Sequence, residues 1–165
     1  MNHCTLRLAQ SDDLPQLAEI ERECFSHPLT EAQLASLLGD PNTLFLTALA
    51  PAPSSEPCTL HDAHSLSASL WAQTVLDECY IGNVAVRPAF RRRGIADALL
   101  RELERLAVER SFSFLTLEVR AGNAPAIALY EKNGYSRVGL RRGYYSDPKE
   151  DAVLMTKTLN QEKHG

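Results

Sequence analysis

The chain has 165 residues, of which 44% are hydrophobic and 23% charged, and its formal net charge is -4. This length and composition suit one soluble globular domain with a hydrophobic core, and the acidic balance disfavours non-specific nucleic-acid binding while remaining compatible with basic partners. The sequence has no apolar run of transmembrane length and no apolar signal core after Met1. We therefore expect a cytoplasmic protein with no membrane segment.

The first third of the chain predicts a strand, two helices and a second strand. Residues 5–9 alternate as a strand, and Ser11 is placed to cap a helix. That helix carries one apolar stripe, formed by Leu14, Leu17, Ala18, Cys24 and Phe25. Residues 30–33, Thr-x-x-Gln, are a capping box that opens a second helix, and residues 43–49 follow as a strand.

Residues 51–66 differ in composition from the rest of the chain, because they are rich in Pro and Ser. We expect a flexible insert there, longer than a hairpin connection needs. The insert contains Cys58-x-x-His61-x-x-His64, but a structural zinc site needs a fourth ligand, so no metal is expected. The other three cysteines lie in apolar segments and are expected to be small core residues with free thiols: Cys4, Cys24 and Cys79.

An apolar strand, a basic loop and a helix then follow one another, and this is the most informative stretch of the chain. Residues 70–76 and 79–86 predict a hairpin, after which Arg91-Arg92-Arg93-Gly94-Ile95-Ala96 leads into a helix that reaches about Arg110. A basic glycine turn before a helix offers free backbone N–H groups, the positive end of the helix dipole and forked donors. This combination predicts a phosphate or pyrophosphate site, although a plain helix start with solvated arginines has the same pattern.

A second group of polar residues lies downstream. Residues 114–120 alternate as a strand with Glu118 near its exit, and Asn123 is placed to cap the next helix. Tyr130 follows Asn123 by seven residues, so both lie on one helix face, and Asn133-Gly134 ends that helix. Strands are expected at residues 135–142 and 152–159.

These motifs together resemble the GCN5-related N-acetyltransferases, and more closely the RimI-type ribosomal-protein alanine N-acetyltransferases. The resemblance covers residues 5–158. It is carried by Arg-x-x-Gly-x-Ala at 91–96, Leu-Glu-Val-Arg-x-x-Asn at 117–123, Ala-Leu-Tyr-Glu-x-x-Gly-Tyr at 128–135 and Arg-Arg-Gly-Tyr-Tyr at 141–145. One departure stands out, because the family usually has Pro-Trp-Ser or Pro-Trp-Thr where this chain has Pro28-Leu29-Thr30.

The resemblance implies an α/β mixed sheet in one domain over residues 1–165, with the order β-α-α-β-β-β-α-β-α-β-β, a tail at 160–165 and two central parallel strands that splay apart. It implies acetyl-CoA as co-substrate and no metal. Its implied cofactor-binding residues are Val84, Ala85, Val86, Arg91, Arg92, Arg93, Gly94, Ile95, Ala96 and Asn123. The backbone of Asn83 to Val86 would pair with the pantetheine arm, and the N–H groups near Val84 to Val86 could hold the oxyanion.

The implied chemistry uses Glu118 as base, directly or through a water, and Tyr130 as acid. A single carboxylate suits an α-amine, whose pKa is near ~8, better than a lysine at ~10.4. Taken alone, Glu118 could be a solvated strand residue, Tyr130 a core residue and Asn123 only a helix cap.

The implied acceptor is the N-terminal alanine of the eighteenth protein of the small ribosomal subunit. Leu29, Tyr144 and Tyr145 are expected to line a groove between the loops 26–30 and 143–151, where Glu150 and Asp151 would favour a basic peptide. Two alternatives remain, which are an N-acetyltransferase for another N-terminus or small amine and a non-catalytic acyl-CoA-binding module. We expect a monomer or weak dimer.

Overall fold

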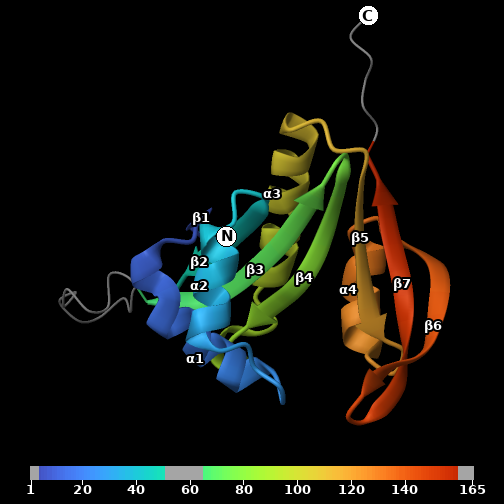
Figure 1. The fold of residues 1–165 in the computed structure, drawn as a ribbon, viewed down its shortest axis with the longest axis horizontal. Coiled ribbons are helices and arrows are strands. Elements are labelled where there is room, and N and C mark those ends of the chain that lie inside the picture. The colour runs from blue at the N-terminus through green and yellow to red at the C-terminus, as the bar shows by residue number, and fades with distance from the viewer. Residues whose placement is uncertain (1–3, 51–64, 160–165) are drawn as a thin grey trace, which may run out of the picture. The chain divides into compact units, whose positions relative to one another are not determined.

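The structure is a computed structural model that describes residues 4–50 and 65–159. The chain forms two compact units. The first unit takes in residues 1–73 and 82–103, and the second takes in residues 74–81 and 104–165. The order of helices and strands confirms the predicted α/β succession, with a 3-10 turn added before each of two helices (Figure 1). No helix of the described ranges is long and apolar enough to cross a membrane.

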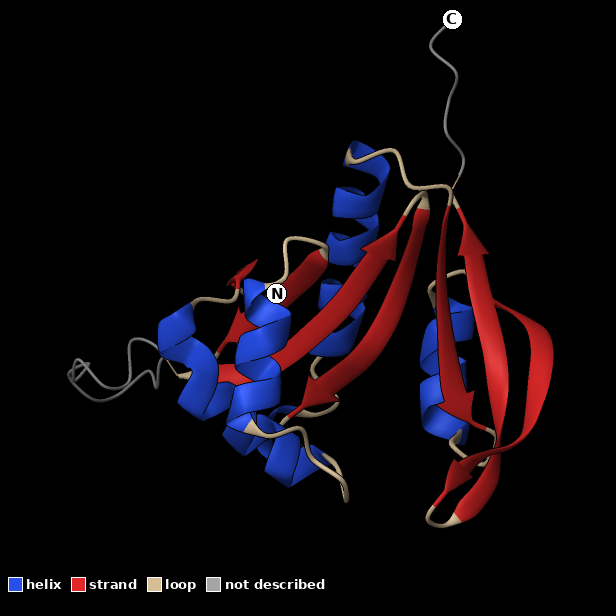
Figure 2. Cartoon of the chain, in the orientation of Figure 1, coloured by secondary structure: helices blue, strands red, loops and turns tan. Residues whose placement is uncertain are grey.

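The first unit is built from antiparallel strands with two helices packed on them. Its strands are β1 (Leu6–Leu8), β2 (Thr43–Leu49), most of β3 (Leu66–Val75) and the second half of β4 (Glu78–Val86), and its helices are α1 (Leu14–Cys24), α2 (Glu31–Gly39) and the first half of α3 (Ile95–Glu109). β2 pairs with both β1 and β3. The helices α1 and α2 pack on these strands (Figure 2). Their packing buries Ile20, Leu34 and Phe45 in one cluster. This burial supplies most of the stabilisation of such a layer, at about 25 cal/mol per Å².

Local sequence signals set the helix starts in this unit, with one correction. Thr30 and Gln33 form the predicted capping box, since the Thr30 Oγ1 accepts the Gln33 N–H and the Gln33 side chain accepts the Thr30 N–H. The prediction that Ser11 caps α1 is wrong. Residues 11–13 form a 3-10 turn instead, and the Asp13 carboxylate accepts the Gln10 N–H at 2.8 Å while pairing with Arg7.

The second unit is a small sheet covered by one helix. It contains β5 (Phe114–Arg120), α4 (Ala124–Lys132), β6 (Ser136–Ser146), β7 (Lys149–Thr158), the ends of α3 and β3, and the first half of β4. β7 lies between β5 and β6 and is antiparallel to both. β4 pairs with β5 in parallel at Glu78–Tyr80 and Phe114–Thr116. This short parallel pairing is the one that the resemblance implied for the two central strands.

The structure also corrects the prediction for residues 143–151. Residues 143–151 were expected to form a loop, but β6 continues through Tyr145 to Ser146 and pairs with β7. The register shifts between Arg141 and Tyr145, and Gly143 adopts a φ of 62° there. A bulge at a glycine therefore keeps the strand going, where the sequence pattern alone indicated an interruption.

The insert predicted at 51–66 is corrected at one end. β3 begins at Leu66, whose side chain is buried, four residues before the predicted strand. Residues 51–64, including Cys58, His61 and His64, lie outside the described residues. Cys79 is buried in the core as predicted, whereas Cys4 and Cys24 are only half-buried.

Candidate active site

The basic loop of the first unit has the backbone of an anion site. Residues 91–94 are exposed, and both Arg92 and Gly94 adopt left-handed φ angles, of 63° and 77°. A side chain added at Gly94 would meet nothing within 4 Å, so the glycine is used for its backbone conformation and not for space. Ile95 and Ala96 begin α3, where helix geometry leaves their N–H groups without an intrahelical acceptor.

Two of the three arginines in this loop contact neighbouring uncharged groups. The Arg91 Nε donates to the Val86 carbonyl at 3.0 Å, and its guanidinium lies 3.9 Å from the Cys24 Sγ. The Arg93 guanidinium stands 5.4 Å from the centre of the Phe90 ring. None of these partners neutralises the positive charges, so the loop stays available to an anion.

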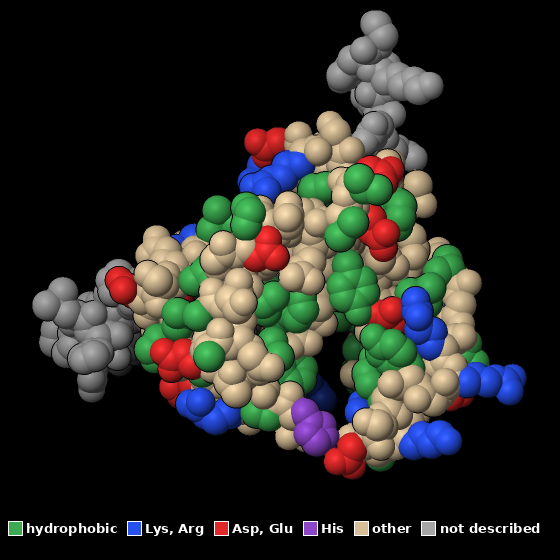
Figure 3. Space-filling view, viewed as in Figure 1, with side chains coloured by type: hydrophobic (Ala, Val, Ile, Leu, Met, Phe, Trp, Pro, Cys, Tyr) green, Lys and Arg blue, Asp and Glu red, His purple; other side chains and the backbone are tan. Residues whose placement is uncertain are grey.

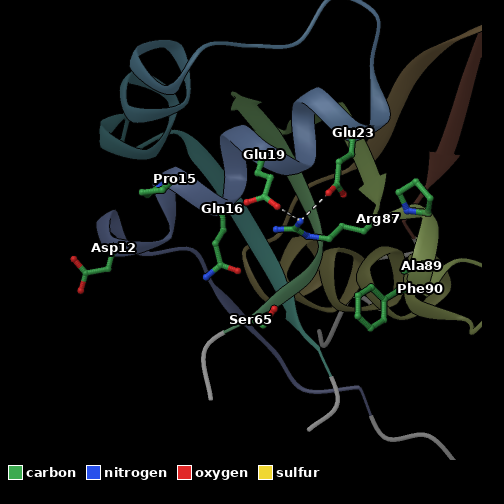
Figure 4. Close-up of a pocket in the computed structure, with 10 residues that line it drawn as sticks. Asp12, Pro15, Gln16, Glu19, Glu23, Ser65, Arg87, Ala89 and Phe90 are labelled. Atoms are coloured by element: carbon green, nitrogen blue, oxygen red, sulfur yellow. Dashed lines mark hydrogen bonds and ion pairs between the residues drawn. The ribbon is translucent and has the colours of Figure 1, made fainter. Parts of the chain in front are cut away.

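Arg87, in contrast, is already paired with carboxylates. Its guanidinium points between Glu19 and Glu23 of α1, at 2.8 and 3.1 Å, on the wall of an open hollow of about 920 Å³ (Figure 4). The two acidic side chains satisfy its charge. Arg87 is therefore not a free donor, and the basic loop proper begins at Arg91.

The side chains of the predicted cofactor strand mostly serve the core. Ala85 is buried in the apolar cluster under α1, while Val84 and Val86 are half-buried. The contact that the resemblance implied for these residues is through their backbone, and it remains a prediction.

Glu118 lies at the centre of a polar cluster in the second unit. Its side chain is 7% exposed, and both of its carboxylate oxygens are engaged. Tyr80 donates a short hydrogen bond to the Glu118 Oε2, and the Arg141 Nε lies 3.3 Å from the Oε1. The carboxylate is thus held from β4 on one side and from β6 on the other. The alternative that Glu118 is a solvated strand residue is therefore wrong.

Sequence reasoning missed Tyr80 and Arg141. Tyr80 lies opposite Thr116 in the parallel pairing, and residues two apart in a strand share a face, so Tyr80 and Glu118 reach the same side. Burial, and then the hydrogen bond to Glu118, raise the pKa of Tyr80 well above its ordinary value. Its hydroxyl therefore stays protonated and remains a donor. Period-two alternation in residues 78–86 was the one signal that could have indicated it.

Tyr144 and Tyr145 extend this cluster along β6. Their rings meet edge to face at 5.0 Å, and the Arg120 guanidinium stands 4.2 Å from the centre of the Tyr145 ring. Arg141 lies 5.9 Å from the Tyr144 ring. Both tyrosines, predicted for the acceptor side, are therefore strand residues and not loop residues, and Arg141, which pairs with Glu118, lies beside one of them.

Tyr130, the predicted acid, is buried on the inner face of α4. Its ring packs edge to face with Tyr135 at 5.7 Å. Burial first, and the neighbouring Tyr145 second, raise the pKa of Tyr130 to about 12. Both a core role and an acid role are compatible with this placement, and the hydroxyl is protonated in either case.

Asn123 confirms the cap reading. Its side-chain Oδ1 accepts the Ala126 N–H at 3.2 Å, at the start of α4, and Pro125 lies in the first turn. A contact with the cofactor remains a prediction for this exposed residue.

The acidic residues predicted to attract a basic peptide are already engaged. Glu150 pairs with Arg120 at 3.2 Å and accepts the Gly122 N–H at 2.7 Å, and Asp151 accepts the Gly143 N–H at 2.8 Å. Lys and Arg side chains stand over β6 and β7 on the face drawn in Figure 3. These two carboxylates therefore stabilise the hairpin, and they do not form a free acidic surface.

Leu29 lies in the connection between α1 and α2 and is half-buried. Its side chain lines a shallow hollow of about 300 Å³ together with Leu37 and Trp71. Trp71 lies flat on Gly82, since a Cβ at that glycine would overlap the indole ring. The family usually has a tryptophan at the position of Leu29. In this chain a tryptophan on β3, Trp71, lines the same hollow instead.

Comparison with known proteins agrees with this geometry. The model of the acetyltransferase (GNAT) family matches residues 14–135. The ribosomal protein bS18 alanine N-acetyltransferase of Escherichia coli (strain K12) is 35% identical over 158 residues, which cover 94% of this chain and 98% of that protein.

Solved structures give the same relationship. The crystal structure of the ribosomal-protein-S18-alanine N-acetyltransferase from Escherichia coli matches with a TM-score of 0.80 and 32% identity, covering 99% of each chain. That of Arabidopsis thaliana NAA60 in complex with acetyl-CoA matches with a TM-score of 0.84, covering 96% of this chain and 100% of that one. Because that second match is only 23% identical, it bears on the fold alone.

Proposed function

Because this chain belongs to the acetyltransferase (GNAT) family, we propose that it is an N-acetyltransferase acting on the N-terminal alanine of the small-subunit ribosomal protein bS18. The activity of its Escherichia coli relative, an alanine N-acetyltransferase of that ribosomal protein, supports this acceptor. The proposal rests on one observation: the Glu118 carboxylate is nearly buried and is bound by Tyr80 and Arg141. Such a group is positioned for proton transfer and has no evident role in holding the core.

Acetyl-CoA supplies the acetyl group, and the residues of the first unit fit its pyrophosphate. The turn at residues 91–96 is positively charged and exposes backbone N–H groups. It combines the left-handed backbone conformation of Gly94, the free N–H groups of Ile95 and Ala96 and the exposed side chains of Arg91 to Arg93. The backbone of Val84 to Val86 would hold the pantetheine arm, and Asn123 would contact the cofactor from the start of α4. The proposal requires no metal.

Glu118 takes the proton from the acceptor amine, directly or through one water. A carboxylate oxygen has two acceptor sites, so each Glu118 oxygen keeps one after Tyr80 and Arg141 have bound. An α-amine with a pKa near ~8 is partly deprotonated at neutral pH, whereas a lysine near ~10.4 is not. This chemistry therefore favours a protein N-terminus over a lysine side chain.

Tyr130 donates a hydrogen bond to the leaving sulfur. Its pKa of about 12 keeps the phenol protonated at any physiological pH. Because the leaving thiol, with a pKa near ~8.5, is the stronger acid, the phenol stabilises the developing thiolate, which takes up the proton that Glu118 removed from the amine or one from solvent. Leu29 in the first unit and Tyr144 and Tyr145 in the second are each proposed to contact the acceptor. With a ribosomal protein as acceptor, we expect the enzyme to act in the cytoplasm.

The test is acetylation of synthetic peptides with mass-spectrometric location of the acetyl group. We expect an alanine-starting peptide with the bS18 N-terminal sequence to be acetylated at its terminal nitrogen. A matched peptide with a blocked N-terminus and an internal lysine should be nearly inert. Acetylation chiefly on lysine would overturn the N-terminal assignment, and acetyl-CoA binding without thiol release would indicate a non-catalytic module.

A further inference from the structure

The Glu21 side chain is a buried carboxylate that the proposed chemistry does not use. Glu21 lies on α1 and is 2% exposed. Each of its two carboxylate oxygens accepts a hydrogen bond from a different segment of the chain. The Oε2 accepts the backbone N–H of Leu29 at 3.0 Å, and the Oε1 accepts the Asn83 side-chain amide at 3.1 Å. One carboxylate therefore joins a helix, a connection and a strand within the first unit.

The chemistry of this contact explains why an acid is present. Both donors are neutral amide groups, and burying a carboxylate without a cation is costly. An apolar side chain would fill the space at lower cost, but it would leave two amide groups without acceptors. Of the uncharged residues, only an amide could reach both donors, and it would present one acceptor and one donor to them. A carboxylate alone accepts from both without rearrangement.

The two donors belong to segments with proposed functions. Leu29 lies between the end of α1 at Cys24 and the start of α2 at Glu31, in a connection whose residues Ser26 and His27 are exposed. Asn83 is the first residue of the β4 segment 83–86, whose backbone is expected to pair with the pantetheine arm. The Glu21 contact fixes the position of the acceptor connection relative to β4.

We propose that Glu21 is a positioning residue for the acceptor, holding the Leu29 connection in the place that peptide binding requires. The inference rests on the proposed function, since it assumes that Leu29 contacts the acceptor. Glu21 itself touches neither substrate, and its loss should act on acceptor binding far more than on acetyl-CoA binding.

The hydrogen-bond pattern allows a rescue that packing alone does not predict. E21A removes both acceptors. N83D places a second carboxylate against Glu21, which is unfavourable because neither group can donate. The double variant E21Q/N83D restores a complementary pair, since the new amide can donate to the new carboxylate while its oxygen still accepts from Leu29.

The experiment measures the KM for the alanine-starting peptide and the KM for acetyl-CoA in these variants. We expect E21A and N83D to raise the peptide KM about tenfold, equivalent to about 1.4 kcal/mol. In E21A, the acetyl-CoA KM should change less than about threefold. The double variant should recover most of the loss. D13N is the matched control, because Asp13 is also a buried carboxylate on the same unit, paired with Arg7 instead, and both of its KM values should stay near wild type.

Equal rises in both KM values, the same peptide effect in D13N, or no recovery in E21Q/N83D would overturn the positioning role. Hydrogen exchange of the Leu29 amide provides a readout that needs no substrate. It should accelerate in E21A and not in D13N. A wild-type protein that fails to acetylate the peptide would refute the proposed function, whereas unchanged Leu29 exchange in E21A would refute the contact itself.

Discussion

Replacing Tyr80 by phenylalanine removes one hydroxyl from the cluster around Glu118 and leaves the aromatic ring in place. The lost bond is a donor to a carboxylate that is 7% exposed. Hydrogen bonds to charged groups contribute about 1.5–3 kcal/mol. Arg141, the remaining partner, is 56% exposed and is screened by solvent, so it can offset only a small part of the loss.

The effect on turnover follows from that range. A tenfold change in rate corresponds to about 1.36 kcal/mol, so Y80F should lower kcat between about tenfold and a hundredfold if the bond orients Glu118 in the transition state. Thiol release with the alanine-starting peptide measures kcat, and denaturant unfolding measures the free energy of unfolding. The KM for acetyl-CoA should change little, since Tyr80 is not among the residues proposed to bind the cofactor.

Y135F is the matched control for this prediction. It deletes the same atom from a buried tyrosine of the second unit, but the Tyr135 hydroxyl has no hydrogen-bond partner among the described residues. We therefore expect Y135F to retain wild-type turnover and equal or greater stability, because it removes an unsatisfied polar group. Wild-type turnover in Y80F, or equal losses in Y80F and Y135F, would refute the reasoning.

Three further predictions concern other residues. G94V should fold, because a side chain at this position meets open space. A valine disfavours the left-handed φ of 77°, so the loop backbone should shift and acetyl-CoA should bind more weakly. Unchanged affinity by calorimetry would contradict the loop assignment. E118Q should lower kcat by about 10²–10⁴-fold with little change in cofactor affinity, and normal turnover would require another base. The folded pKa of Tyr130, about 12, lies above the ordinary 10.0, so the stability it contributes is present below pH 10 and is lost as the pH rises towards 12; alkaline unfolding curves of Y130F should lack this component.

Trp71 and Gly82 give a fourth prediction within the first unit. An alanine Cβ at Gly82 would overlap the indole ring, and overpacking of this kind costs about 1–3 kcal/mol. Thermal melting of G82A should show this loss, and a smaller ring in the double variant G82A/W71L should recover part of it. An unchanged melting temperature in G82A would mean that the indole moves freely.

The sequence by itself determined the local features of this protein. The capping box at Thr30, the glycine turn at Gly94 and the cap at Asn123 are each formed within a few residues of the chain. Their backbone geometry depends on short-range sterics and hydrogen bonds, so a short motif is sufficient to predict them. The order of helices and strands followed from the same signals and from hydrophobic periodicity.

Only the tertiary structure decided which side chains meet. Tyr80 reaches Glu118 across 38 residues, and Asn83 reaches Glu21 across 62. These pairs depend on strand register and on how α1 packs against β4, and a shift of register by one residue would turn each side chain to the opposite face. The engagement of Glu150 by Arg120 is of the same kind, and it removed an acidic surface that the sequence had indicated. Charge and residue type are properties of the sequence, but whether a charge is free or paired depends on which distant segment packs beside it.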